Sequence, residues 1–371
     1  MRVASVACLF FFPTLSGCIM PRPWLAPTAA ETCSTVHQPL DGKILVASFR
    51  SSDCHTGRLR WTPYRSEAGE FSAVDEKGQT TFNSRDVWLK ELKRRAPTVE
   101  TAPVVYIHGF DNGEDFAVER ADAIRVLLCD EHSAKLNPSS CTPRRPVVAV
   151  TWPSFNRLVK YTWDEANNEW AQGPAVALIV EIAREMPGTI LVAHSMGNRI
   201  LIPAAMEASR ERASLDGLIL ASPDVDRESV AELLRRPGGL GFPATIYASL
   251  KDQALSLSWR THGNPRAGDL SYWVSGRVRA YPYDVLNNAE VVDTTSLSDG
   301  VAAHAAFIET LQGAADLCHV LAGELPVRDP DPAHPHYWAL RDNSLAGDSC
   351  EQRAIAAVQI ASRNPAEHRK R

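Results

Sequence analysis

The sequence predicts a mixed α/β fold with a mostly parallel central sheet and helices on both of its faces. Seven short apolar segments recur along the chain, and most are continuously apolar rather than alternating, which is typical of strands covered on both sides. Segments with helical spacing separate several of them. The expected strands are residues 43–49, 103–110, 146–153, 189–195, 216–224, 243–250 and 290–295.

The order of these elements favours parallel pairing. The first strand, KILVASF, is followed by a polar and aromatic stretch at 50–85, in which we expect one or two further strands. Apolar residues at helical spacing then predict helices at 114–128, 170–185 and 198–208. Each helix lies between two expected strands, and such a crossover leaves the two strands parallel. The last strands, DGLILASPD, PATIYASL and EVVDTT, extend the same sheet.

The composition indicates a large buried core and no nucleic-acid partner. The chain has 371 residues, of which 44% are hydrophobic, enough for one large domain or two small ones. The formal net charge is −5, and the basic end, residues 368–371, is a short run at the terminus. A nucleic-acid-binding domain usually carries a basic patch or stripe, so we expect no such partner.

The first residues follow the order of an export signal. Arg2 precedes an apolar stretch at 3–15, which is shorter than the roughly 20 residues that a transmembrane helix needs. The LSGC that follows resembles the lipobox of bacterial lipoproteins, which implies cleavage before Cys18 and acylation of that cysteine. Residues 1–17 are therefore expected to be a lipoprotein signal peptide. The alternative is an ordinary secretory signal with a chance cysteine.

An acylated Cys18 would anchor the protein, because several acyl chains together bind a bilayer durably. Ile19 stands where the enterobacterial sorting pattern has aspartate for inner-membrane retention, which favours the outer membrane. Residues 18–37 are rich in Pro, Ala and Thr and are expected to form a tether. We expect a lipid-anchored protein of the bacterial cell envelope that faces the periplasm.

Six cysteines are expected in disulfides. Of the eight in the chain, Cys8 would leave with the signal peptide and Cys18 would carry lipid. An even number in an exported protein favours disulfides. Zinc is the competing interpretation, because His319, His334 and His336 lie near two of the cysteines, but no CxxC accompanies them and we expect no metal site. Pairing of sequence neighbours gives Cys33–Cys54, Cys129–Cys141 and Cys318–Cys350.

The segment ILVAHSMGNRI, 190–200, ends an apolar strand on a serine with small residues two positions away on each side. A nucleophile elbow has this pattern, because its strained strand-to-helix turn leaves no room for larger side chains there. The usual motif is GxSxG, and here Ala193 replaces the first glycine and Gly197 keeps the second. The pattern predicts a nucleophile at Ser195, and it puts the Met196 N–H where it can stabilise an oxyanion. The alternative is a plain strand-to-helix turn.

A second buried strand ends in YIHGF, 106–110. A glycine after such a strand lets the backbone turn an N–H inward, so we expect the N–H of Phe110 to be the second oxyanion donor. His108 is interpreted as a core histidine that braces this loop by hydrogen bonds.

The chain order serine, aspartate, histidine predicts the rest of a catalytic triad. Asp252 follows the strand at 243–250, and His304 follows the last strand and its loop. A carboxylate at such a strand end can accept from the imidazole Nδ1–H, and the imidazole can then deprotonate Ser195. The alternatives left open are Asp224, Asp226, Asp293 and Asp299 for the acid, and His262 for the base.

Five segments together resemble an uncharacterised family of bacterial α/β-hydrolases, the DUF900 group. They are HGFDN (108–112), TWPS (151–154), AHSMGNR (193–199), PDVD (223–226) and ASLKDQALSLS (248–258). The likeness covers about residues 43–304. It implies an α/β-hydrolase fold and a serine hydrolase triad of Ser195, Asp252 and His304, with Ala193 as the departure from the usual motif.

The resulting hypothesis is a lipid-anchored serine hydrolase that cleaves a carboxylic ester through an acyl-enzyme on Ser195 and needs no cofactor. One alternative is a non-catalytic hydrolase-fold scaffold or binding protein of the envelope. Another is an acyltransferase that uses the same triad. Residues 38–313 are expected to form the hydrolase domain, and residues 314–371 a C-terminal extension packed on it with a disordered tail.

Overall fold

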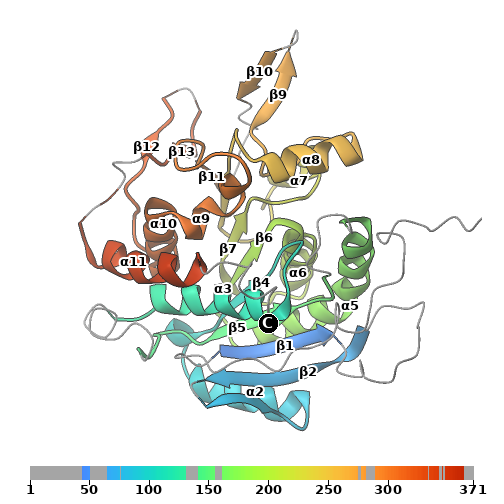
Figure 1. Ribbon diagram of the computed structural model, residues 1–371. Helices are drawn as coiled ribbons and strands as arrows, with labels where there is room; N and C mark the ends of the chain where they lie inside the picture. Colours follow the sequence, from blue (N-terminus) through green and yellow to red (C-terminus); the bar gives the residue numbers. More distant parts are fainter. Residues whose placement is uncertain are drawn as a thin grey trace, which may run out of the picture.

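An 11-stranded sheet forms the centre of the protein (Figure 1). The computed structural model describes residues 44–50, 65–75, 77–130, 141–154, 161–274, 277–280, 289–332, 334–341, 345 and 347–362. The strands lie side by side in the order β12-β13-β11-β8-β7-β6-β4-β5-β1-β2-β3.

The middle of the sheet is parallel, and it contains all seven strands expected from the apolar segments. The fold class expected from the sequence is therefore confirmed. The parallel strands are these seven and β13, which the sequence did not predict. In spatial order they are β13 (Tyr337–Ala339), β11 (Ala289–Asp293), β8 (Ala244–Ala248), β7 (Leu215–Ala221), β6 (Thr189–His194), β4 (Val104–Ile107), β5 (Val147–Thr151) and β1 (Ile44–Arg50).

Antiparallel strands close both edges of this sheet. On one side β2 (Arg65–Asp75) pairs with β1 and with β3 (Gly78–Thr81), which confirms the expectation of strands in the polar and aromatic stretch. On the other side β12 (Asp329–Pro330) pairs with β13. A separate hairpin of β9 (Ser271–Val274) and β10 (Arg277–Ala280) stands at the top of Figure 1.

Helices cover both faces of the sheet and form two apolar layers with it. Alternate strand residues point into opposite layers, so Ala193 belongs to the first and Val192 to the second. The first layer is formed with α2 (Arg85–Arg95), α5 (Tyr161–Glu185), α6 (Asn198–Arg210) and α7 (Arg227–Arg235). The second is formed with α3 (Glu114–Leu127), α9 (Ala306–Glu309), α10 (Leu311–Ala322) and α11 (Ser349–Ala361).

Before β6, two helical regions differ from the sequence-based expectation. α5 begins at Tyr161, earlier than expected, because its first turns bury polar residues that interrupt the apolar pattern: Asp164, Asn167 and Asn168. α2 was not predicted, since most of its residues are polar and the buried ones are Trp88, Leu89 and Leu92.

The C-terminal segment contributes to the same sheet and the same core. α10 already begins at Leu311, so the boundary expected between residues 313 and 314 falls inside a helix. β12 and β13 extend the sheet, and α10 and α11 pack in the layer that contains α3. The tail after residue 362 lies outside the described residues.

Two of the three expected disulfides, Cys129–Cys141 and Cys318–Cys350, are present and thereby confirmed. The pair Cys33–Cys54, the signal peptide, Cys18 and the tether lie outside the described residues. No helix in the described part of the chain is both long and apolar enough to cross a bilayer.

The Cys318–Cys350 disulfide ties α11 to α10, with a sequence separation of 32 residues. Closing a loop of that length lowers the entropy of the unfolded chain, which is worth about 3 to 4 kcal/mol in the chain-entropy model. We expect the double substitution Cys318→Ser and Cys350→Ser to lower the unfolding free energy by about that amount, measured by urea denaturation followed by circular dichroism. A midpoint equal to that of the wild type would contradict this expectation.

Candidate active site

Ser195 lies at the turn between β6 and α6 with a strained backbone. Its φ is 52°, in the left-handed region that non-glycine residues rarely adopt. Such a conformation costs on the order of 1 to 3 kcal/mol and persists only where the surroundings fix it. The serine opens a single 3₁₀ turn, η5 (Ser195–Gly197), that leads directly into α6. This is the strand–turn–helix context that a nucleophile elbow requires.

Two glycines allow this turn to approach the end of β4. A Cβ on Gly197 would lie 2.6 Å from the carbonyl oxygen of His108, and a Cβ on Gly109 would lie 2.7 Å from the Cβ of Ser195. Both distances are too short for real carbon atoms, so larger residues would push the segments apart. Ala193 is fully buried in β6 with its methyl group accommodated, so the departure from the usual glycine leaves the elbow intact.

Two backbone N–H groups belong to the segments that approach each other here. Phe110 follows Gly109, and within the described part of the chain its N–H has no hydrogen-bond acceptor. Met196 is the second residue of η5, where an N–H has no partner inside the helix. These are the two donors expected from the sequence, and their role towards an oxyanion stays a prediction.

His108 braces the loop that carries Phe110, in the structural role expected from the sequence. Its Nε2 accepts from the backbone N–H of Trp152 at 3.0 Å, and its Nδ1–H donates to the Gly109 carbonyl at 2.8 Å. The rings of His108 and Trp152 stack with their centroids 4.9 Å apart. Burial, aided by the charge of Arg50, lowers the pKa of His108 to about 3, so the imidazole stays neutral and keeps this tautomer.

Arg50, which sequence reasoning missed, holds the far end of the same loop. Its side chain is buried, and it donates to the backbone carbonyls of Asn112 at 2.9 Å and Ser154 at 3.1 Å. Glu114 lies 3.7 Å from its Nε. The signal in the sequence was a single arginine at the end of a continuous apolar strand, which predicts neither the loop nor the residues that it contacts.

Asp252 and His304 form a direct pair. His304 Nδ1 lies 2.7 Å from Asp252 Oδ2, and the carboxylate is fully buried. Asp252 is also the N-cap of α8 (Gln253–His262), where Oδ1 accepts from the Leu255 N–H. One carboxylate oxygen therefore fixes the helix and the other is free to orient the imidazole, which leaves Nε2 of His304 as the nitrogen available to a serine hydroxyl.

The aspartate acts on the protonation of the imidazole as well as on its orientation. Burial lowers the pKa of His304, but the charge of Asp252 and its hydrogen bond raise it by more, and Asp224 and Glu309 add to the rise. The pKa of His304 therefore lies above its ordinary value. An imidazolium formed by taking the proton of a serine is stabilised in this environment.

Asp224, the alternative acid, is bound to other partners. Its carboxylate accepts from Arg266 Nε at 2.7 Å, Ser258 Oγ at 2.6 Å and the Tyr161 hydroxyl at 2.5 Å. Burial raises the pKa of Asp224, but Arg266 and Arg199 lower it by more, so it stays ionised. Its backbone N–H donates to the Ser195 carbonyl at 3.1 Å, so it supports the elbow. This network around Tyr161 was not foreseen.

The remaining candidates also have partners other than His304. Asp226 caps α7, and Asp293 accepts from the Thr295 N–H. Asp299 pairs with Lys251 at the surface. His262 contacts Glu165 at 2.9 Å through Nε2 and the Ser258 carbonyl at 2.8 Å through Nδ1, so both of its ring nitrogens are occupied.

His194, the residue before the serine, brings Ser195 and His304 together. Its Nε2–H donates to the backbone carbonyl of His304 at 2.8 Å, and the two rings lie 4.7 Å apart between centroids. Among the described contacts, no hydrogen bond joins Ser195 Oγ to His304 Nε2. Catalytic hydrogen bonds often tighten only in the complex with substrate.

The comparison with protein families agrees with this architecture. A family model described as an α/β hydrolase of unknown function, DUF900, matches residues 83–311. The chain belongs to this family. The matched region begins just before α2 and ends at the first residue of α10, so it includes Ser195, Asp252 and His304. A search of curated proteins finds no match to the chain.

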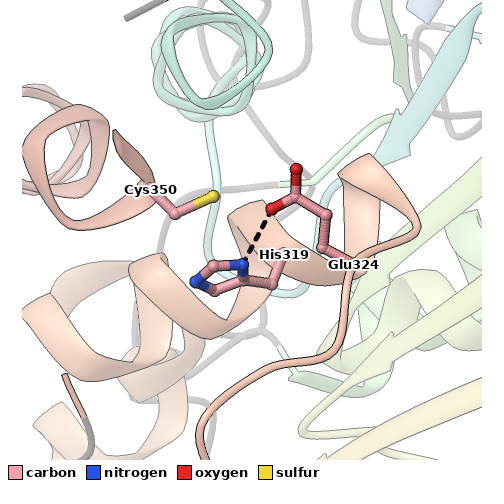
Figure 2. A group of neighbouring side chains, drawn as sticks. All are labelled: His319, Glu324 and Cys350. Carbon is pink, nitrogen blue, oxygen red and sulfur yellow. Dashed lines mark hydrogen bonds and ion pairs between the residues drawn. The ribbon is translucent and has the colours of Figure 1, made fainter. Parts of the chain in front are cut away.

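A second polar cluster lies far along the chain, on α10, just after its C-cap, and on α11. Figure 2 shows the His319 ring facing Glu324 and Cys350. An imidazole nitrogen, a carboxylate oxygen and the Cys350 Sγ, the atoms that could bind a metal, all lie within 4.8 Å of one another. Cys350 Sγ is bonded to Cys318 and offers no thiolate in this state. The remaining imidazole and carboxylate are too few for the four ligands of a structural zinc site.

The His319 cluster instead ties two helices together. His319 Nδ1 lies 3.0 Å from Glu324 Oε2, and Nε2 lies 3.0 Å from Asp348 Oδ2. The other oxygen of Asp348 caps α11 by accepting from the Cys350 and Glu351 N–H groups. We therefore interpret the cluster as structural, in support of the adjacent disulfide.

The raised pKa of His304 predicts the pH dependence of any reaction in which this imidazole accepts a proton. The base must be neutral to accept a proton, so the rate at which a fluorophosphonate reacts with Ser195 should increase as the pH rises. The midpoint of this increase should lie above the ordinary histidine pKa of about 6.5. Asp252→Asn removes the charge that raises this pKa. We expect the midpoint to move to lower pH and the plateau rate to fall by about 10³- to 10⁴-fold.

Asp299→Asn provides the matched control for that measurement. It removes a carboxylate near the same loop, but its partner is the surface residue Lys251. Its pH profile should coincide with that of the wild type. Equal effects of the two substitutions would contradict the assignment of Asp252.

Proposed function

We propose that the protein is a serine hydrolase that cleaves a carboxylic ester through an acyl-enzyme on Ser195. The observation that carries this proposal is the hydrogen bond between Asp252 and His304. The backbone carbonyl of His304 also accepts a hydrogen bond from His194, the residue directly before Ser195. The strained φ of Ser195 and the N–H groups of Phe110 and Met196 support the same reading.

The reaction would proceed in two halves. Ser195 Oγ attacks the ester carbonyl carbon while His304 Nε2 takes its proton, and the resulting oxyanion accepts from the Phe110 and Met196 N–H groups. Collapse breaks the bond to the alcohol, which leaves with the proton from His304. A water molecule then attacks the acyl-enzyme with His304 as base, releases the acid and restores Ser195.

Asp252 supports both halves. It keeps the Nδ1–H tautomer of His304, so that Nε2 can face the serine, and it stabilises the imidazolium that exists after each proton transfer. Apart from the ester and this water molecule, every group named in these steps belongs to the chain. An acyltransferase would use the same first half and replace water by an alcohol or amine in the second.

A fluorophosphonate probe tests the nucleophile directly. The full-length protein should form a covalent adduct at Ser195, identified by mass spectrometry of the intact protein and its peptides, and Ser195→Ala should form none. Ser258→Ala is a matched control, because Ser258 is another buried serine, whose hydroxyl donates to Asp224. A folded wild-type protein that stays unlabelled would reject the enzymatic proposal and favour a scaffold or binding role.

We also propose that Cys18 anchors the protein to the bacterial outer membrane, facing the periplasm, on the strength of the LSGC motif. In cells fed an alkyne-bearing fatty acid, the wild type should incorporate the label and sediment with membranes. Cys18→Ser should lose the label and the sedimentation, whereas Cys8→Ser should retain both. A labelled Cys18→Ser protein would contradict the proposal.

A further inference from the structure

The side chain of His194 points to the face of the sheet that is covered by α9 and α10, next to the loop that carries His304. Alternate residues of β6 face opposite layers, and Val192, two residues earlier, belongs to the layer that contains α9 and α10. The ring of His194 accordingly contacts the ring of Phe307 on α9, with centroids 5.4 Å apart. Ser195, one residue later, turns away from the strand through its positive φ.

The imidazole of His194 lies between the two loops that serve the serine. On one side its Nε2–H reaches the His304 carbonyl at 2.8 Å. On the other, a Cβ placed on Gly109 would lie 3.2 Å from its Nδ1. His194 thus contacts both the loop of the oxyanion donor Phe110 and the loop of the base.

The donor role of His194 follows from the chemistry of its partner. A carbonyl oxygen only accepts, so Nε2 of His194 must carry the hydrogen. Burial, together with the charge of His304, lowers the pKa of His194 well below its ordinary value, so the ring remains neutral. A neutral ring has one N–H, which is committed to this bond. It also adds no positive charge when His304 becomes an imidazolium.

Asp252 supplies the other polar restraints on the base and its loop that bear on this argument. The loop before His304 is attached by a bridge between Asp252 and Gly300, and the His304 side chain is attached to Asp252 as well. Both restraints come from the β8–α8 side. The bond to His194 comes from the last residue of β6, which directly precedes Ser195, so it sets the position of the base relative to the nucleophile.

We propose that His194 is a positioning residue, which holds the His304 backbone in register with Ser195 through its Nε2–H···O=C hydrogen bond. The proposal rests on the serine hydrolase function proposed above, because it concerns the distance between the same two reacting groups. His194 itself touches no reacting atom. Its effect is on the placement of His304, where a displacement of about 1 Å can cost a rate factor of about 10².

Three substitutions separate the donor from the ring. His194→Phe keeps the aromatic packing against Phe307 and removes the donor. His194→Gln restores an N–H at a similar reach, and His194→Asn carries the same amide on a side chain one methylene shorter. We expect the rate of fluorophosphonate labelling at Ser195 to fall about 10- to 100-fold in His194→Phe and His194→Asn. In His194→Gln it should recover to within about threefold of the wild type.

Hydrogen–deuterium exchange supplies a readout that does not need activity. Amides of residues 296–305 should exchange severalfold faster in His194→Phe and His194→Asn than in the wild type or in His194→Gln, with exchange in β6 unchanged. This pattern also excludes global destabilisation, which would accelerate exchange throughout. Should His194→Phe not fold, the Gln and Asn pair makes the same comparison.

The outcomes distinguish this inference from the function on which it rests. A wild-type protein that is not labelled at Ser195 would overturn the enzymatic proposal, and the exchange data would still decide whether His194 holds the loop. A labelled wild type, with labelling and exchange the same in all three variants, would overturn the role of His194 and leave the hydrolase proposal standing. Equal losses in the Gln and Asn variants would also reject the hydrogen bond as the cause.

Discussion

The close approach of the β6–α6 turn to the end of β4 is the constraint on which the site depends. It requires glycine at 197, where a side chain would meet the His108 carbonyl, and at 109, where a side chain would meet the serine itself. It also forces Ser195 to a φ of 52°, a strain that the surrounding parallel ladder must offset. As a result, the turn that carries Ser195 and Met196 lies against Gly109, the residue before Phe110.

Two buried carboxylates lie near this point, and their partners give them different roles. Asp224 is ionised and paired with Arg266, and its oxygens are occupied, so it stabilises the elbow without competing for the imidazole. Asp252 uses one oxygen to cap α8 and the other to contact His304. Because the charges of both raise the pKa of His304, the environment favours the imidazolium that proton transfer creates.

The parts of this arrangement that the sequence predicted share a simple physical origin. Strands of a parallel sheet are apolar throughout because both faces are buried, so the central strands were found with small errors at their ends. The tight turn at Ser195 could be predicted because an elbow restricts the neighbours of its serine to small residues. The proximity of Asp252 and His304 could be predicted because each follows a strand that ends at the same edge. Their catalytic roles stay a prediction. α2 was missed because three buried residues leave too weak a pattern.

Contacts between distant segments were beyond the reach of the sequence. His194 and His304 are 110 residues apart, and Arg50 and Ser154 are 104 apart, so neither pair produces a local pattern. The choice between Asp252 and Asp224 likewise depended on which arginines lie nearby. Sequence patterns report burial and local turns, whereas the partners of a buried polar group follow from the strand order.

The C-terminal segment affects the position of His304 through packing. The His304 loop, η6 (Val301–Ala305), continues into α9, where Phe307 contacts His194 and Tyr247. α9 lies so close to α10 that a Cβ on Gly313 would be 2.0 Å from the Ala306 carbonyl oxygen. α10 is in turn fixed to α11 by the Cys318–Cys350 disulfide and the His319 cluster. Because proteins pack as densely as crystals, displacement of α10 would be transmitted to His304. The helices after residue 311 are therefore part of the support of the site.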